Sequence, residues 1–189
     1  MNIIKDGTGK GFNAQVYENN KLAVDSKSAS LQHTISAEEN QAYQMIGIST
    51  LSSGETIVMQ ITNRSSSNIV MTYLRHQIVG ASGGTAFPNV NNYFSIRLGR
   101  TYYSGGTELS PVNVYAGSGN SPNIEAYSDP TLVGTPLEID RWYTKADGDM
   151  YTFNKEGALI IPTNQGFEIT YQGDQTSGTI YARVSFIME

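Results

Sequence analysis

The sequence predicts an all-β protein: an antiparallel β-sandwich, jelly-roll-like, that carries an extended N-terminal arm with a hairpin. Short runs of alternating apolar and polar residues recur along the chain, and turn-forming residues fill the segments between them. Charged residues make up only 15% of the 189 residues, against about a quarter in an average domain. No segment has the period of a long amphipathic helix, so the crossover helices of a parallel α/β fold are not expected. The alternation therefore favours antiparallel pairing.

Two parts of the chain differ in character. Residues 1–29 are predicted to form an arm and hairpin, and residues 30–189 a single β-sandwich domain. Within the arm, the strand-like runs Phe12–Tyr17 and Lys21–Asp25 flank a Glu-Asn-Asn sequence at residues 18–20. Asn residues favour the backbone conformations of tight turns, so this arrangement predicts a β-hairpin.

The glycine-rich run Gly7–Gly11 is predicted to act as a hinge behind the apolar pair Ile3 and Ile4. It is not a phosphate-binding loop, because the G-x-x-x-x-G-K-[ST] spacing is missing and a strand rather than a helix follows. Ser36–Glu39 has the pattern of a helix capping box. Few apolar residues extend it, so we expect a polar loop with a helical turn.

The body is predicted to consist of short strands that bury alternate residues. These strands are expected at Ser30–Ile35, Tyr43–Ser49, Glu55–Asn63, Asn68–Val79, Tyr93–Leu98, Met150–Asn154, Ala158–Ile161, Gly166–Tyr171 and Thr179–Met188. The alternating residues expected to share an inward face in three of them are Ile57, Met59 and Ile61; Phe94, Ile96 and Leu98; and Ile180, Ala182, Val184, Phe186 and Met188.

Residues 99–150 are predicted to be a long irregular loop region. They contain four of the six prolines and several glycines, and only Val112–Ala116 and Leu137–Tyr143 have the pattern of short strands. Long loops often carry function. The aromatic residues expected there on outward loops or at subunit contacts are Tyr102, Tyr103, Tyr115, Tyr127 and Trp142.

Composition excludes several classes of function. The net charge is −5 and no run of Lys or Arg occurs, so we expect no nucleic-acid partner. No stretch of 18 apolar residues predicts a membrane span. The chain has no cysteine, which removes disulfides, thiolate catalysis and cysteine-type zinc sites. The N-terminus lacks the apolar core of a signal peptide, which indicates synthesis in the cytoplasm.

The sequence offers no convincing catalytic or metal site. Asp147-Gly148-Asp149, with Glu138 or Asp140, supplies too few nameable ligands for Ca²⁺, and a turn is expected instead. His33 and His76 lack the spacing of a metal-binding jelly-roll enzyme and are expected on polar strand faces. A glycoside hydrolase needs a pair of carboxylates, and the candidates for such a pair here are Glu108, Glu125, Asp129, Glu138 and Asp140. We therefore predict no enzyme activity and no cofactor.

Asn63-Arg64-Ser65 matches the acceptor pattern for N-glycosylation. Such matches are common by chance, and no signal peptide accompanies this one. We therefore expect no glycan at Asn63.

About the first 45 residues carry a family resemblance. They contain an I-I-K-D-G-T-G opening, an A-x-V, an N-N-x-L-x-V-x-S turn and strand, a histidine and a later A-Y; these are Ile3–Gly9, Ala14–Val16, Asn19–Ser26, His33 and Ala42-Tyr43. This arrangement resembles a family of tailed-bacteriophage virion proteins. The rest of the chain matches that family only in character, as a β-rich body with long loops.

The resemblance implies a non-enzymatic virion structural protein. We expect a capsid decoration, or cement, protein that binds the outer capsid surface and stabilises the shell. It would be made in the bacterial cytoplasm, act as a homotrimer and contact the major capsid protein or other virion proteins. The arm residues expected to attach it to the capsid or to neighbouring subunits are Ile3, Ile4, Lys5, Phe12, Val16 and Tyr17.

Two alternatives remain open from the sequence. The first is a tail, fibre or spike module that binds host surface glycans through the aromatic loops, with Tyr103 and Trp142 as stacking residues. The second is a small polysaccharide hydrolase, which requires that two carboxylates of residues 108–149 converge.

Overall fold

The computed structural model describes residues 3–5, 13–16, 22–23, 41–153 and 159–189. The chain divides into two compact units, Met1–Leu31 and Gln32–Glu189. In the described ranges the regular structure is β-strand and every strand pair is antiparallel, which confirms the predicted fold class. None of these residues belongs to a helix long and apolar enough to cross a membrane. The predicted features outside the described ranges are Phe12, Tyr17, His33, the strand Ser30–Ile35 and the capping box Ser36–Glu39.

The N-terminal unit contains a three-stranded antiparallel sheet of β1 (Ile3–Lys5), β2 (Asn13–Val16) and β3 (Leu22–Ala23), in the order β1-β2-β3. Strands β2 and β3 pair as the hairpin that the sequence predicts. Ile3 and Ile4, predicted as an apolar pair in front of a hinge, belong to strand β1, which pairs with β2. The predicted hinge, Gly7–Gly11, lies outside the described residues and stays a prediction.

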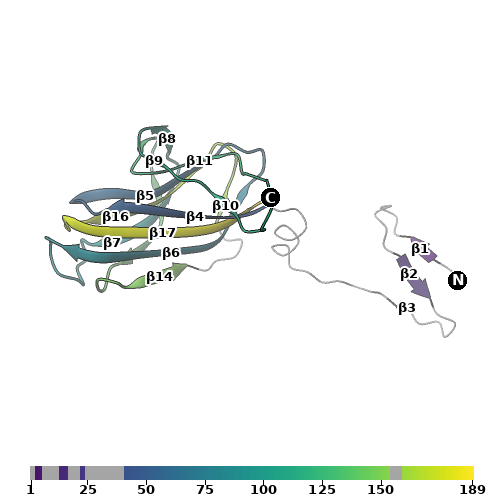
Figure 1. Cartoon of the computed structure of the whole chain (residues 1–189), viewed down its shortest axis with the longest axis horizontal. Coiled ribbons are helices and arrows are strands. Elements are labelled where there is room, and N and C mark those ends of the chain that lie inside the picture. The colour runs from purple at the N-terminus through teal and green to yellow at the C-terminus, as the bar shows by residue number, and fades with distance from the viewer. Residues whose placement is uncertain (1–2, 6–12, 17–21, 24–40, 154–158) are drawn as a thin grey trace. The chain divides into compact units, whose positions relative to one another are not determined.

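The first large sheet of the second unit, here called the β17 sheet, has β17 at its centre (Figure 1). Its order is β10-β4-β17-β6-β14, and β15 also pairs with β6. The strands are β4 (Ala42–Thr50), β6 (Ile69–Ser82), β10 (Val112–Asn113), β14 (Met150–Phe153), β15 (Ile160–Ile161) and β17 (Ser177–Met188). Along β17, Val184 lies opposite Met45 of β4 on one side and Leu74 of β6 on the other.

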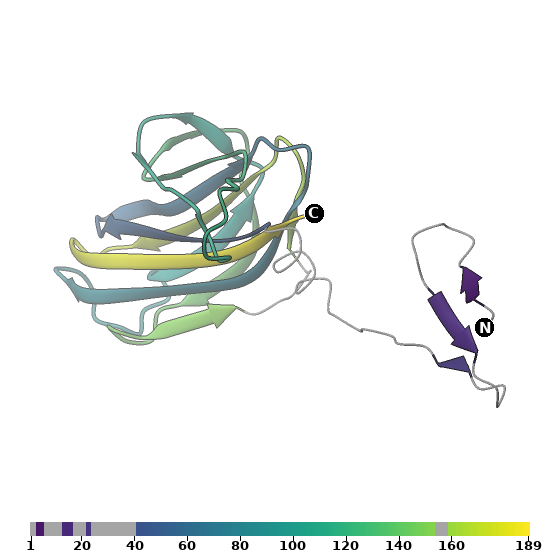
Figure 2. The same ribbon diagram turned by 45° about the vertical axis from the view of Figure 1, so that its right-hand side comes forward.

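The second large sheet, here called the β16 sheet, faces the first across the core (Figure 2). Its order is β13-β7-β16-β5-β11-β9. The strands are β5 (Gly54–Asn63), β7 (Tyr93–Leu98), β9 (Thr107–Glu108), β11 (Ile124–Ser128), β13 (Leu137–Tyr143) and β16 (Gly166–Gly173). A separate pair, β8 (Thr101–Ser104) and β12 (Thr131–Val133), contacts β5, where the Tyr102 N–H donates a 3.0 Å hydrogen bond to Thr62 Oγ1.

One hydrophobic core fills the space between the two sheets. The β17 sheet contributes Leu74, Val184 and Phe186, and the β16 sheet contributes Ile96 and Phe167, each of them almost fully buried. Burying a side chain of this size stabilises a fold by about 1.5–3 kcal/mol. The described part of the chain is therefore a β-sandwich held by apolar packing, and its jelly-roll connectivity stays a prediction.

The residues predicted to face inward from β7 and β17 do so. In β5 the prediction is wrong for Ile57, which is partly exposed, whereas its neighbour Val58 is fully buried. The cause is a β-bulge: Ile169 and Thr170 of β16 lie opposite Met59 and Ile57, so Val58 is an extra residue. A bulge of this kind reverses which side of the strand faces the core.

Residues 99–150 contain more strand than predicted. Strand β13 has the predicted bounds, and β10 lies within the predicted run Val112–Ala116, but β8, β9, β11 and β12 were expected to be loop. Strand β11 is ordered by its partner β5, where Ala126 lies opposite Ile61. Such pairing depends on tertiary contacts that a short run of sequence does not reveal.

Candidate assembly surface

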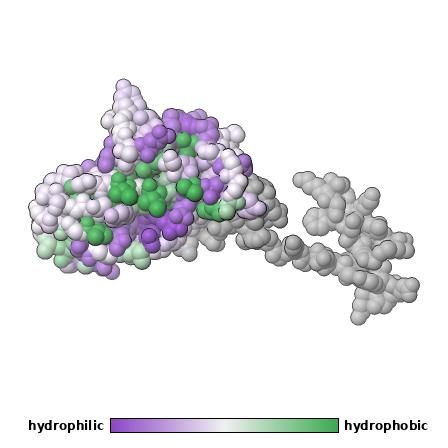
Figure 3. Space-filling view, in the orientation of Figure 1, coloured by the Kyte–Doolittle hydropathy of each residue, from purple (hydrophilic) through white to green (hydrophobic). Residues whose placement is uncertain are grey.

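The outer face of the β17 sheet exposes a group of large apolar side chains. In β4, Tyr43 and Met45 point into the core, and the alternate residues Ile46 and Ile48 point outward with 52% and 54% of their surface exposed. We call this surface the apolar patch and define it as Ile46, Ile48, Val112, Val114 and Tyr181. Figure 3 shows hydrophobic atoms gathered in the region where Figure 1 places β4, β10 and β17.

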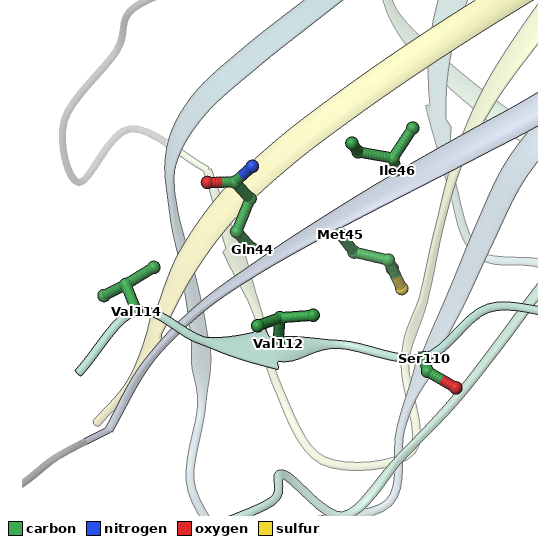
Figure 4. Close-up of a pocket in the computed structure, with 6 residues that line it drawn as sticks. All are labelled: Gln44, Met45, Ile46, Ser110, Val112 and Val114. Carbon is green, nitrogen blue, oxygen red and sulfur yellow. The ribbon is translucent and has the colours of Figure 1, made fainter. Parts of the chain in front are cut away.

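A groove of about 470 Å³ lies at one end of the apolar patch. It is lined by Gln44, Met45, Ile46, Ser110, Val112 and Val114. Figure 4 shows that the chain before Val112 turns away from β4 toward Ser110, so the groove opens where β10 stops pairing. At its border the Gln44 side-chain oxygen accepts a 2.7 Å hydrogen bond from Arg183.

The β17 sheet carries no carboxylate. None of the strands β4, β6, β10, β14, β15 and β17 contains Asp or Glu, although the chain has 17 acidic residues and a net charge of −5. Arg75 and Arg183 line a second hollow of about 210 Å³ on the outer face, beside Ile46 and Tyr181. This face is therefore apolar and cationic within an acidic protein, a combination that attracts acidic or neutral protein surfaces.

The β16 sheet carries paired arginine and glutamate side chains. Glu168 of β16 is almost fully buried and accepts hydrogen bonds from Arg100 Nε at 2.9 and 3.0 Å and from Arg100 Nη2 at 2.7 Å. Burial raises the pKa of Glu168, and the Arg100 guanidinium opposes that rise. Burial also acts to raise the pKa of Glu55, but Arg97 and Arg100 outweigh it and the net shift is downward.

The ion pairs continue to the edge strand β13. Glu138 accepts two 2.9 Å hydrogen bonds from Arg141, whose guanidinium carbon lies 4.0 Å from the centre of the Tyr93 ring. Arg97 of β7 lies 3.9 Å from Glu138 and also pairs with Glu55. This face already satisfies its own charges, so it is less suited than the apolar patch to bind another protein.

The predicted aromatic residues divide into exposed and packed groups. Tyr103 and Tyr115 are 70% and 48% exposed. Tyr102 and Tyr127 stack on each other, with ring centres 3.9 Å apart and planes 8° from parallel. Trp142 lies in β13, within the predicted strand Leu137–Tyr143, but it packs, partly buried, against the core instead of facing outward. The five residues therefore do not form one surface.

The predicted arm residues are placed only in part. Ile3, Ile4 and Lys5 form β1, and Val16 ends β2. Phe12 and Tyr17 lie outside the described residues. The assignment of all six residues to attachment stays a prediction.

The structure explains several motifs that sequence analysis considered. Both Asp147 carboxylate oxygens accept backbone hydrogen bonds, from Gly80 at 3.1 Å and Ala81 at 3.0 Å, so this residue closes a loop. Asn63 is fully buried and its amide donates to the carbonyl oxygens of Ser67 and Ile161, which leaves no room for a glycan. Among the described residues, no group of three or more His, Asp or Glu side chains is arranged to hold a metal ion.

The candidate carboxylates have different partners. Glu125 pairs with Arg64 at 2.8 Å, and Glu138 pairs with Arg141. Asp140 accepts a hydrogen bond from the N–H of the next residue at 2.9 Å. Burial raises the pKa of Asp129, whose backbone has a φ of 50°. These contacts explain the positions of Glu125, Glu138 and Asp140.

His76 is the largest departure from a sequence expectation. It was expected on a polar strand face, but it is 1% exposed in the core and its ring centre lies 3.9 Å from that of Phe94. Neither of its ring nitrogens has a hydrogen-bond partner among the described residues. Burial lowers the pKa of His76 from 6.5 to about 3, so the ring is neutral in the folded protein.

Sequence analysis did not identify the apolar patch. A signal was present in the run Tyr43–Ser49, because Met45, Ile46 and Ile48 place apolar residues on both faces of the predicted strand. A strand that is apolar on both faces is expected to be covered on both faces.

The comparisons with known proteins identify no family. No family model matches the chain, and no curated protein matches it. One similar solved structure is described as "Crystal structure of the T13 IBDV viral particle reveals a missing link in icosahedral viruses evolution", with a TM-score of 0.21 and 10% sequence identity. The match covers 91% of this chain and 42% of that one. At this TM-score the likeness carries no argument about fold or function.

Proposed function

We propose that the protein is a non-enzymatic structural component of a tailed-phage virion, a decoration protein that binds the outer capsid surface and stabilises the shell. The observation that carries this proposal is the outer face of the β17 sheet, which exposes the apolar patch and two arginines and has no carboxylate in its strands. Contiguous exposed apolar surface of this kind marks protein interaction sites. The resemblance of the first 45 residues to phage virion proteins supplies the partner class, the major capsid protein.

The N-terminal unit offers a second contact in this proposal. A unit of 31 residues in a chain without cysteine is smaller than most domains that fold without disulfides, metals or a partner. Attachment to the capsid or to a neighbouring subunit would supply the missing stabilisation. Two weak contacts on one molecule also raise the overall affinity by effective concentration.

Charge reversal on the outer face of the β17 sheet tests the proposal. The Arg75→Glu substitution should weaken binding to purified, undecorated capsids about tenfold or more, because it replaces an attraction to an acidic surface with a repulsion. Binding of the unaltered protein should also weaken as salt is added. Co-sedimentation with capsids over a concentration series measures both effects.

A matched control is Arg64→Glu, which makes the same charge change near β11 of the other sheet, where Arg64 pairs with Glu125. This variant should bind capsids like the unaltered protein. A variant that begins at Gln32 should bind more weakly than the full chain if the N-terminal unit takes part. Equal binding by Arg75→Glu and the unaltered protein would contradict the proposed surface.

Glycan binding by a tail or fibre module is the second candidate. The observation that favours it is Tyr103, which is 70% exposed and follows Tyr102 in strand β8. Exposed aromatic rings stack on sugar rings. On this hypothesis the Tyr103→Ala variant should lose signal on a host-glycan array that the unaltered protein recognises, and an array without signal for either protein rejects it.

A further inference from the structure

Strand β4 has an open edge. The Ala42 carbonyl oxygen accepts a 3.0 Å hydrogen bond from the Val114 N–H on the β10 side, and the Gln41 carbonyl accepts one from Met188 on the β17 side. Backbone groups alternate between the two sides of a strand. The N–H and C=O groups of Ile46, Ile48 and Thr50 therefore point toward the β10 side.

Strand β10 does not reach these groups. It pairs with β4 only at Tyr43 and Gln44, and no other described strand pairs with β4 on that side. The backbone from Ile46 to Thr50 is thus free to bind another strand. We call these residues the open edge of β4.

The open edge lacks the features that usually prevent edge pairing. Natural edge strands carry charges, proline or a bulge that block the addition of another strand. The edge strand β13 has such protection, with Glu138, Asp140 and Arg141 and a register shift between Glu138 and Asp140. Strand β4 has no charged residue, no proline and no register shift in its pairing with β17. An unprotected edge flanked by exposed isoleucines is expected to be covered in the working protein.

We propose that the open edge of β4 pairs with the open edge of β4 in a second copy of this chain, across a two-fold axis at Ile48. Unpaired main-chain groups at every second residue require an extended strand as partner. Among the other edge strands of this unit, β13 is protected and the uncharged β14 has only four residues, so the five residues of the open edge are best matched by the same edge of a second copy. Two copies of an acidic protein would repel each other at most surfaces, but β4 is neutral.

Antiparallel pairing about Ile48 places Ile46 of one copy opposite Thr50 of the other. The groups that point to the open edge then form about six hydrogen bonds between the copies. The outward side chains of Ile46 and Ile48 from both copies lie on one face and shield each other from water. A two-fold contact closes after two copies, so this pairing gives a dimer and not the homotrimer expected from the sequence.

Light scattering coupled to size-exclusion chromatography tests the pairing on the full chain. The protein should elute at twice its monomer mass of 20.6 kDa. Ile48→Pro removes an N–H that points to the open edge and leaves the β17 ladder intact. Ile48→Lys adds a charge of the kind that protects natural edges. Both variants should elute as monomers across the concentration series.

The matched control is Tyr181→Lys, which adds the same charge to the same face on the central strand β17. It should stay dimeric, because β17 has no open edge. Hydrogen exchange supplies a second readout: the amides of Ile46 and Ile48 should be protected in the dimer and exchange quickly in Ile48→Lys. A monomeric unaltered protein, or an oligomer that survives both Ile48 variants, would overturn the pairing.

This inference is separable from capsid binding. The Arg75→Glu variant should remain a dimer while it loses affinity for capsids, because Arg75 lies on β6, away from the open edge. Because Ile48 also belongs to the apolar patch, Ile48→Lys is expected to weaken capsid binding as well, so the pairing is judged from the oligomeric state and from hydrogen exchange alone.

Discussion

Replacing Arg100 with methionine should lower the free energy of unfolding by about 3–5 kcal/mol at pH 8. The Glu168 side chain is only 1% exposed, and Arg100 donates three hydrogen bonds to its carboxylate. Methionine fills much of the same volume but cannot donate a hydrogen bond, so the carboxylate is left buried and unpaired. Urea unfolding followed by circular dichroism measures the change.

The loss should depend on pH. Burial already raises the pKa of Glu168, and removing Arg100 raises it further. A carboxyl group whose pKa is higher in the folded state stabilises the fold below that pKa and loses this effect as the pH rises through it. The Arg100→Met variant should therefore be less impaired at pH 5 than at pH 8.

Arg141→Met is a matched control, because Arg141 and Glu138 are 39% and 31% exposed and such pairs contribute about 0–1 kcal/mol. Replacing Glu168 with methionine in the Arg100→Met background should restore most of the lost stability, since no charge is then buried. A loss as small in Arg100→Met as in Arg141→Met would show that Glu168 does not need its partner.

Local patterns in the sequence predicted many strands but not their neighbours. The bounds of β7 and β13 and the inward face of β17 follow from period-2 alternation within each segment. The position of β16 between β5 and β7 does not, because Phe167 meets Ile61 and Leu98 from distant parts of the chain. Pairing of this kind is decided by the combined packing of both sheets.

The same limit explains why the Arg100–Glu168 pair was missed. In the run Phe167–Ile169 a glutamate between two apolar residues has the pattern of a solvent-facing position. It is nevertheless buried, with an arginine 68 residues earlier in the chain as its partner. The open edge of β4 was missed for a related reason: only the short length of β10, which sequence did not reveal, leaves that edge uncovered.

Acid should destabilise the folded protein through His76. Burial lowers the pKa of this residue to about 3, whereas an unfolded histidine keeps its ordinary value of 6.5. As the pH falls, the unfolded state therefore binds a proton at this residue before the folded state does. The free energy of unfolding is at its full value above pH 6.5 and decreases as the pH falls from 6.5 toward 3. Between pH 7.5 and pH 5 the loss should be about 2 kcal/mol.

The groups around His76 favour this interpretation. Its ring contacts Phe94, Trp142 and Tyr151, which offer no carboxylate to stabilise an imidazolium ion. The Glu55 and Asp174 carboxyl groups have lowered pKa values, so their protonation changes the free energy of unfolding only below about pH 4.5. The Asp129 and Glu168 carboxyl groups have raised pKa values, so their protonation favours the folded state. Acid therefore stabilises the protein through these two groups, opposite to its effect through His76.

His76→Phe isolates the effect, because phenylalanine keeps the ring contacts and has no titratable group. Unfolding free energies from urea titrations at pH 7.5 and pH 5 should differ by about 2 kcal/mol less in this variant than in the unaltered protein. The comparison uses a difference between two pH values, so a constant cost of packing the new ring does not affect it.

Glu55→Gln, which removes a carboxylate that titrates at lower pH, should retain the full difference. Equal pH dependence in His76→Phe and the unaltered protein would mean that another group is responsible, and that the folded core accommodates a charged His76.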